Sequence, residues 1–206
     1  GFALLCGVVG FIDDFIKDYN LTLFKSEWFK VAKGSVSKWE MDSISYYEHE
    51  HELANVNTNK YNIINFFDLD EEPVIYDYTY YKDKKIPKNK IFTIMGTVLD
   101  KNPSKSTISI LTPDGVVTVK TYKGSFAHYN RQVSRKISAD KKEIVEKSWF
   151  SRGNLVLMNG YRKDDNFLLK TYKVKGEDVQ RTVNLITGVE KNGDLILQSE
   201  RKSAYE

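Results

Sequence analysis

The sequence predicts a mainly β protein with a helical N-terminal lead-in, a five-stranded OB-fold Greek-key barrel and an extra C-terminal β-hairpin. Three observations lead to this fold class. Five strand-like runs follow residue 90, a long connection separates the third run from the fourth, and two further alternating runs flank an Asn-Gly turn. With 206 residues and 41% hydrophobic content, the chain is long enough to bury a core.

Two helices are expected before the barrel. The stretch over 2–18 is apolar, but Asp13 and Asp14 interrupt it well before the roughly 18 residues that a membrane span needs, so we expect a buried helix. A second helix is expected over about 26–51, with Ser26 as its N-cap. Because the chain starts abruptly in an apolar run, we expect it to be a piece of a longer protein.

An acidic linker or lightly structured arm is expected over 55–90, where periodicity gives way to Asn, Asp, Glu and Tyr with Pro73 and Pro87. Residues 39–83 hold eleven acidic residues and two lysines, which is typical of a solvated spacer. The expected organisation is a helical segment over 1–54, the linker over 55–90, the OB-fold domain over 91–176 and a hairpin extension over 177–206.

The barrel strands are expected where β-branched and aromatic residues alternate between turn signals, over 91–99, 106–112, 115–122, 155–162 and 167–174. The connection over 123–153 is long enough for a helix and a basic loop. Gly96 falls in the middle of the first strand, where a small barrel needs a sharp bend or a bulge. The runs in 183–200 predict the C-terminal hairpin, which extends or caps the barrel.

The net charge of +3 is unevenly distributed. Residues 116–175 carry 14 basic and 5 acidic side chains, a balance of +9, whereas residues 1–115 carry 13 and 17 and residues 176–206 carry 4 and 6. Such concentration is expected of a phosphate-binding surface, although basic faces also occur on proteins that bind no nucleic acid.

The candidate binding face starts in "TPDGVVTVKTYKG". Val117 and Val119 share one strand face, and Thr118, Lys120 and Tyr122 share the other, which is either an ordinary solvated face or a platform for a polyanion. Lysine and arginine neutralise phosphates, and aromatic rings stack on bases without reading sequence. The candidate DNA-binding residues are Thr118, Lys120, Tyr122, Lys123, Tyr129, Arg131, Arg152, Tyr161, Arg162, Lys170 and Tyr172. Phe126 and Phe167 fit the barrel core better.

Several kinds of site are not indicated. The single cysteine, Cys6, excludes an intramolecular disulfide framework and a cysteine-based zinc site, and it fits a reducing, cytoplasmic location. His49 and His51 would point roughly 200° apart on a helix, with no third ligand evident, so no metal site is expected. Ser125 and His128 lack an orienting acid, and no phosphate-binding loop appears.

Two stretches together resemble the C-terminal part of a bacterial or phage DNA polymerase III alpha subunit. The first, "EMDSISYYEHEHEL" over 40–53, resembles the family's E-x-E-x-L-G-F-Y-x-S-G-H-P-L segment before its OB domain. Tyr46 and Tyr47 match the aromatic pair and His51 the histidine, while Ser45 replaces the glycine and Glu52 the proline. The second is the barrel region, in which "DGVVTVK" and "GYRKDDNF" occur in the family's order.

The resemblance implies a fragment of a DNA-directed DNA polymerase whose OB module binds single-stranded DNA template without sequence specificity. The catalytic palm is missing, so the fragment should not polymerise by itself, and the Mg of the parent polymerase would have no site in this chain. Asp68 and Asp70 in "FFDLDEEP" follow the histidine segment, whereas the family's metal-binding aspartates precede it, so we interpret them as solvated acids. His51 is then a structural residue.

Two other interpretations of the function remain open. The OB module could dock other replisome proteins, with nucleic-acid binding secondary, or the chain could be an OB protein unrelated to polymerases. Steep salt dependence of DNA binding would favour the first interpretation over protein docking. No membrane partner is expected.

Overall fold

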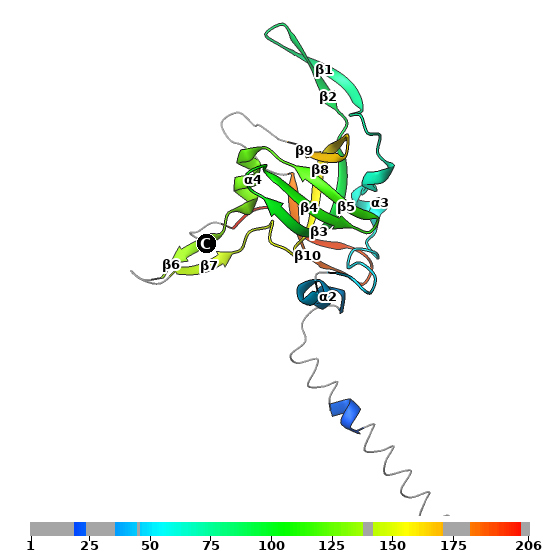
Figure 1. Cartoon of the computed structure of the whole chain (residues 1–206), viewed down its shortest axis with the longest axis vertical. Helices are drawn as coiled ribbons and strands as arrows, with labels where there is room; N and C mark the ends of the chain where they lie inside the picture. Colours follow the sequence, from blue (N-terminus) through cyan, green and yellow to red (C-terminus); the bar gives the residue numbers. More distant parts are fainter. Residues whose placement is uncertain (1–18, 24–35, 45, 138–141, 171–181, 203–206) are drawn as a thin grey trace, which may run out of the picture.

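A closed β-barrel forms the centre of the molecule (Figure 1). The computed structural model describes residues 19–23, 36–44, 46–137, 142–170 and 182–202. The helix expected over 2–18 lies outside these residues. Within the described ranges the chain is mainly β with few helices, which confirms the predicted fold class.

The five expected barrel strands are all present, as β3 (Phe92–Asn102), β4 (Thr107–Thr112), β5 (Gly115–Lys120), β8 (Leu155–Lys163) and β9 (Asn166–Leu169). Around the barrel the order is β3, β4, β5, β9, β8 and back to β3. Every pairing is antiparallel except β5 with β9. First, second, third, fifth, fourth is the strand order of the OB-fold, and α4 (Lys123–Asn130) lies in its usual connection between the third and fourth strands.

Two glycines allow neighbouring strands to approach closely where the barrel curves. A Cβ atom on Gly96 would lie 2.7 Å from the carbonyl oxygen of Leu111, and one on Gly160 would lie 2.1 Å from that of Leu168. Both distances are shorter than any real contact of that kind, so no other residue fits without moving backbone. At Gly96 the structure shows this close approach to Leu111, and the register irregularity in β3 lies between Val98 and Asp100.

Aromatic side chains pack near both ends of β5. At its start, Phe67 lies against Gly115, and the neighbouring Phe66 packs its ring edge-on against Phe167 with 6.5 Å between centroids. At its end, the chain enters α4, which buries Phe126 and Tyr129 in the same core. Aromatic side chains from two sequence-distant segments thus fill the barrel from opposite ends.

A second, smaller core lies outside the barrel. The C-terminal hairpin forms as predicted from β10 (Val183–Val189) and β11 (Leu195–Gln198), and it extends the sheet because β10 pairs with β8. Its apolar side packs with residues that precede the barrel. The members are Leu53, Val56, Met95, Leu157, Ile186 and Leu195.

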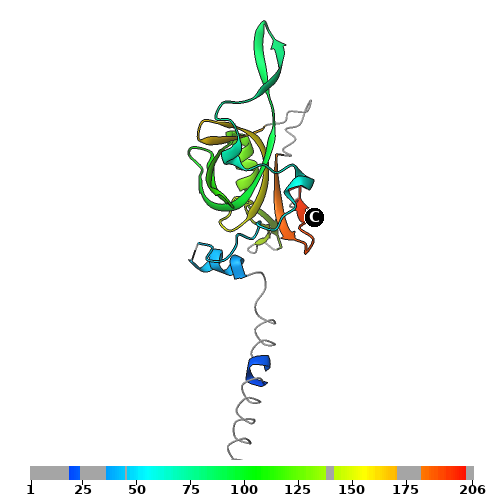
Figure 2. The ribbon, with the colours of Figure 1, turned by 90° about the vertical axis from the view of Figure 1, so that its right-hand side faces the viewer.

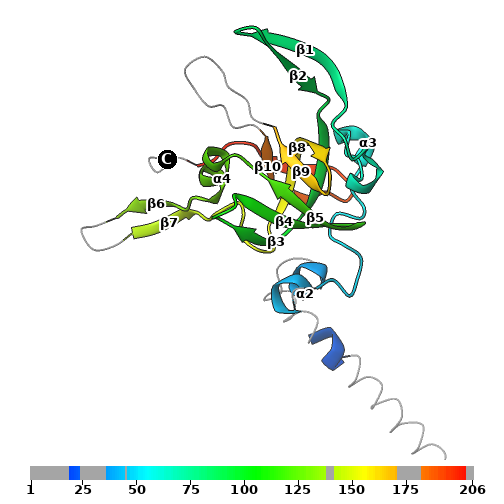
Figure 3. The same cartoon turned by 45° about the horizontal axis from the view of Figure 1, so that its top comes forward.

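The segment expected as an acidic linker therefore has more structure than its composition suggested. Residues 53–69 pack on the barrel and contain α3 (Thr58–Tyr61) and the single 3₁₀ turn η1 (Phe66–Asp68). Residues 75–89 form a β-hairpin of β1 (Ile75–Tyr81) and β2 (Lys84–Asn89), which Figures 1 and 3 show projecting from the barrel.

Two further expectations were wrong. The basic loop expected after α4 is instead a strand pair, β6 (Val133–Lys136) and β7 (Lys142–Glu146), which also extends away from the barrel (Figure 3). The helix expected to continue to residue 51 ends earlier, because α2 spans Val36–Ile44 and the following residues fold back onto it. Figure 2 shows α2 and the β1–β2 hairpin on opposite sides of the barrel. In the portion of the chain described, no helix has the length and apolar character to cross a bilayer.

A buried ion pair joins the C-terminal segment to the barrel. The Nε of Arg201 lies 2.7 Å from Oε2 of Glu146, and the two side chains are 1% and 8% exposed. The Glu146 carboxylate also accepts hydrogen bonds from the indole of Trp149 at 2.9 Å and the amide of Gln198 at 2.6 Å. The guanidinium donates to the carbonyl of Tyr129 at 2.6 Å. The contact of Arg201 Nε with Glu146 is an ion pair without the geometry of a hydrogen bond. The other hydrogen bonds of the carboxylate and the guanidinium stabilise the pair in the absence of solvent.

Removing one partner should be costly. We expect Arg201→Met to lower the free energy of unfolding by about 3–5 kcal/mol, because the Glu146 carboxylate would stay buried without its countercharge. Urea unfolding measures the effect. The matched control is Lys202→Ala, an exposed neighbour whose loss should change stability by less than about 0.5 kcal/mol. Equal effects of the two substitutions would show that the pair does not stabilise the fold.

Candidate nucleic-acid interface

The outer face of β5 presents the residues that the alternation predicted. Val117 and Val119 are 1% and 0% exposed, Thr118 is half-buried, and Lys120 is exposed. Tyr122, just after the strand, is 71% exposed. The valines therefore face the core, and the threonine, lysine and tyrosine face solvent.

Neighbouring strands broaden this face without adding acidic groups beside the lysine. Thr118 pairs with Ser109 of β4 and Asn166 of β9. Lys120 pairs with Thr107 and Leu168 on the same two strands. This part of the barrel surface therefore consists of small polar and apolar side chains around one cation. In an OB-fold the surface of the second and third strands is a common place for oligonucleotides to bind.

Lys123 adds a second cation at the start of α4, one residue after the exposed ring of Tyr122. Within the described part of the chain, neither Lys120 nor Lys123 takes part in an ion pair. Two cations next to an accessible ring can neutralise phosphates while the ring stacks on a base. We call Thr118, Lys120, Tyr122 and Lys123 the β5 face.

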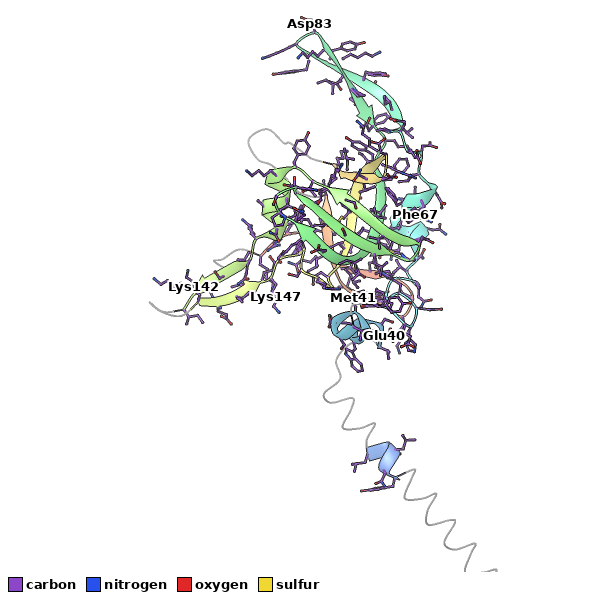
Figure 4. The ribbon with its side chains drawn as sticks, viewed as in Figure 1. Glu40, Met41, Phe67, Asp83, Lys142 and Lys147 are labelled. Atoms are coloured by element: carbon purple, nitrogen blue, oxygen red, sulfur yellow. The ribbon has the colours of Figure 1, made fainter. Side chains whose placement is uncertain are left out.

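Other predicted residues lie at varying distances from this face. Arg131 is exposed immediately after α4, and the β6–β7 pair that follows carries exposed Arg135, Lys136 and Lys142, the last of which is labelled in Figure 4. Arg152 is exposed in the turn before β8. Tyr161 and Lys170 are half-buried, at β8 and just after β9. Tyr172 lies outside the described residues.

Tyr129 was expected on the binding surface, and that placement is wrong. It is 1% exposed, its ring stacks on Trp149 with 5.5 Å between centroids, and its hydroxyl accepts hydrogen bonds from the backbone N–H groups of Thr182 and Val183. The buried side of α4 presents Phe126 and Tyr129 together, three residues apart, to the core. Phe126 and Phe167 are 4% and 0% exposed, as expected for core residues.

Arg162 was also expected to point outward, but its side chain is only 11% exposed. It lies in the inward phase of β8, with Met158 and Gly160, and its guanidinium stacks over the ring of Phe66 at 4.8 Å. It donates to the carbonyl oxygen of Leu69 at 2.7 Å. Arg162 therefore fastens the segment around η1 to the end of the barrel rather than contacting solvent.

A buried hydrogen-bond cluster ties the segment over 40–53 to the barrel. The Tyr47 hydroxyl and Thr97 Oγ1 are 2.9 Å apart, and Thr97 Oγ1 lies 3.2 Å from Nε2 of His51. His51 Nδ1 accepts from the N–H of Leu53 at 3.0 Å, and Nε2 lies 3.0 Å from the carbonyl oxygen of Leu111. These partners fit a neutral imidazole with its proton on Nε2. Burial lowers the pKa of His51 and raises the pKa of Tyr47 above its ordinary range.

Glu40 explains why α2 ends where it does. Its carboxylate accepts hydrogen bonds from the backbone N–H groups of Glu48 and His49, both at 3.0 Å, and it pairs with the ring of His49. The hydrogen bond from the backbone of His49 is the main cause that lowers the pKa of Glu40, and the Glu40 carboxylate raises the pKa of His49. This folded-back turn directs Tyr47 against Thr97 on the outer side of β3, the side that also carries Met95 (Figure 4 labels Glu40 and Met41 of α2).

His49 and His51 contact different partners and do not form a common site for a metal ion. His49 is exposed and pairs with Glu40, whereas His51 is turned into the barrel contact. Asp68 and Asp70 are both exposed. Among the described residues, no group of three or more potential metal-ligating side chains is found.

A basic, aromatic stretch was missed in the sequence. Residues 74–90 contain four tyrosines, five lysines and two aspartates. The count of acidic residues over 39–83 included residues 74–83, so the first half of this basic stretch was grouped with the acidic residues before it. Dividing the count at Val74, where strand-forming residues begin, would have separated an acidic segment from a basic one. The stretch corresponds to the β1–β2 hairpin.

The chain is similar to a segment of two longer proteins. It is 45% identical over 186 residues to a protein named "Probable DNA polymerase YorL" from Bacillus subtilis (strain 168), and equally to one named "DNA-directed DNA polymerase" from Bacillus phage SPbeta. The alignment covers 90% of this chain but 14% of each relative. Identity at this level over nearly the whole chain shows that it is homologous to a segment of these proteins. No protein-family model matches it, and no solved structure matches it significantly.

The His51 contact predicts a pH dependence of stability. Its folded-state pKa lies below the unfolded value of about 6.5, so the unfolded chain binds the proton more readily. The stability that His51 contributes is fully present above pH ~6.5 and is lost as pH falls toward the folded-state pKa. We therefore expect the stability advantage of the native chain over His51→Gln, measured by urea unfolding, to shrink between about pH 7.5 and pH 5.

Comparing the native chain with His51→Gln isolates the contribution of His51, because His49 and His128 are present in both proteins. A stability difference that stays constant across the pH range, or grows as pH falls, would contradict a neutral His51 in the folded protein.

Proposed function

We propose that this chain is the OB module of a DNA polymerase and that its β5 face binds single-stranded DNA template without sequence specificity. The observation that carries the proposal is the β5 face itself, where two cations outside any described ion pair flank a 71% exposed tyrosine on the OB-fold surface. The homology to a segment of proteins named DNA polymerase supports the biological setting.

The chemistry of this face suits an unpaired strand. Lys120 and Lys123 lie at the end of β5 and the start of α4, so their ammonium groups can follow successive phosphates and release counterions. The ring of Tyr122 offers a stacking surface worth ~1–3 kcal/mol per base, and every base has a face that can use it. The hydroxyls of Thr118 and Ser109 can hydrogen-bond to sugar or phosphate oxygens, which carry no sequence information.

We further propose that the polymerase is of the DNA polymerase III alpha type, on the strength of the segment over 40–53. In this chain Tyr47 and His51 of that segment anchor it to Thr97 and Leu111 of the barrel. The resemblance implied a structural role for His51. In this proposal the chain works in the cytoplasm, nucleotidyl transfer with Mg takes place in another part of the protein, and other replisome proteins are further candidate partners.

Fluorescence anisotropy with a labelled, unstructured strand of about 20 nucleotides tests the proposal. Titrated between roughly 50 and 200 mM salt, the affinity of the native chain should fall steeply. The double variant Lys120→Ala/Lys123→Ala should bind more weakly and with a salt slope smaller by about 1.4, since each phosphate contact contributes about 0.7 on single strands. Tyr122→Ala should lose about tenfold in affinity with little change of slope.

The matched control is Lys191→Ala, which removes an exposed lysine from the β10–β11 turn; β10 is three strands away from β5 by the shortest path, through β9 and β8. It should bind as the native chain does. Absence of binding at low salt would overturn the proposal. Salt-insensitive complex formation with a replication protein would instead favour the alternative of a protein-docking module.

A further inference from the structure

The β1–β2 hairpin is exposed on both of its faces. All seven residues of β1 are exposed, and so are five of the six in β2. Its tyrosines Tyr76, Tyr78, Tyr80 and Tyr81 are 68%, 42%, 70% and 61% exposed. A two-stranded hairpin has little stability of its own in water, and so many accessible rings in one element indicate a binding surface.

The base of the hairpin is held by the barrel, while its tip is not. Lys90 N–H donates to the carbonyl of Val74 at 2.7 Å across the base of the hairpin. Just before it, the carbonyl of Glu71 accepts from the N–H of Asp164 in the β8–β9 turn at 2.7 Å, beside the contacts that Arg162 makes. Figure 4 places Asp83 at the far tip, away from the barrel. The hairpin is thus an arm with a defined point of attachment.

The strand register separates the two faces of this arm. Tyr78 lies opposite Pro87 and Tyr80 opposite Lys85, so these four side chains share one face, which we call the tyrosine face. Tyr81 lies opposite Lys84 on the other face. Nζ of Lys85 lies 3.8 Å from the centroid of the Tyr78 ring, so a cation and a ring already meet on the tyrosine face.

The charge of the arm favours a polyanion as its partner. Residues 74–90 carry five lysines and two aspartates, a balance of +3. Asp77 is paired with Lys88 at 2.6 Å. Near the tip, Lys82, Lys84 and Lys85 outnumber the one acid there, Asp83, which leaves a balance of +2 at the tip, and Lys90 adds one positive charge at the base. Lysines beside accessible tyrosines are the combination by which proteins hold unpaired nucleic acid, through phosphate neutralisation and base stacking.

The spacing of the rings fits a base. Residues two apart on a strand are about 6.7 Å apart along it, and stacked bases are about 3.4 Å apart. The backbone positions of Tyr78 and Tyr80 are therefore far enough apart along β1 to admit one base between the two side chains.

We propose that the tyrosine face of the β1–β2 hairpin is a second nucleic-acid contact, which stacks on bases of an unpaired DNA strand while the lysines near its tip contact the phosphates. This inference rests on the proposed function, the binding of single-stranded DNA by this chain, and adds an element separate from the β5 face. The arm would hold DNA beyond the barrel surface.

The test compares matched tyrosine variants in the same anisotropy assay with a strand of about 20 nucleotides. Tyr78→Val/Tyr80→Val retains strand-forming side chains but removes the rings, and we expect it to weaken binding about tenfold or more with an unchanged salt slope. Tyr78→Phe/Tyr80→Phe keeps the rings and should bind as the native chain does. Tyr81→Val makes the same change on the opposite face and should have less than a twofold effect.

The outcomes separate this inference from the proposed function. Native affinity in the valine double variant, or an equal loss in Tyr81→Val, would overturn the stacking role of the tyrosine face. If only the Lys120→Ala/Lys123→Ala variant weakens binding, the result supports the β5 face and overturns the proposal for the arm. If only the Tyr78→Val/Tyr80→Val variant weakens binding, the result supports the arm and overturns the proposal for the β5 face. A native chain that binds no DNA overturns both proposals.

Discussion

Closure of the barrel through β5 and β9 is the constraint on which the rest of the structure depends. The two strands pair in parallel at only three positions, Thr118 with Asn166, Val119 with Phe167 and Lys120 with Leu168. This short contact turns a curved sheet into a closed barrel whose interior the aromatic side chains fill. It also fixes which residues of β5 face outward. The same pairing that buries Val119 therefore presents Lys120 to solvent.

Buried polar side chains, together with the second apolar core, hold the segments outside the barrel to it. Arg162 binds the carbonyl of Leu69, His51 joins the turn after α2 to Leu111, and Arg201 with Glu146 fixes the C-terminal segment. A charged or polar group buried in this way is stable only with its partner in place, so each contact specifies one arrangement of the chain. The OB barrel thereby acts as a common support for elements distant in sequence.

The two proposed binding surfaces use the same chemistry on different supports. The β5 face lies on a rigid, closed barrel, where Thr118 and Lys120 are positioned by strand pairing on both sides. The tyrosine face lies on a hairpin attached only at its base, so its rings can adjust to a strand held by the barrel. A rigid surface and an adjustable arm together suit a ligand that has no fixed shape and is not read by sequence.

The sequence by itself determined the five barrel strands, the C-terminal hairpin and the outward face of β5, because alternation and turn residues act between close neighbours. It did not reveal the β1–β2 hairpin, whose turn at Lys82 and Asp83 has positive φ at both residues without Gly or Asn, and whose second strand contains Pro87. Only the tertiary structure decided that Tyr129 and Arg162 turn inward. Their partners, Trp149 and the backbone carbonyl of Leu69, come from segments that meet only in the fold; Leu69 lies 93 residues from Arg162, so no local pattern encodes the contact.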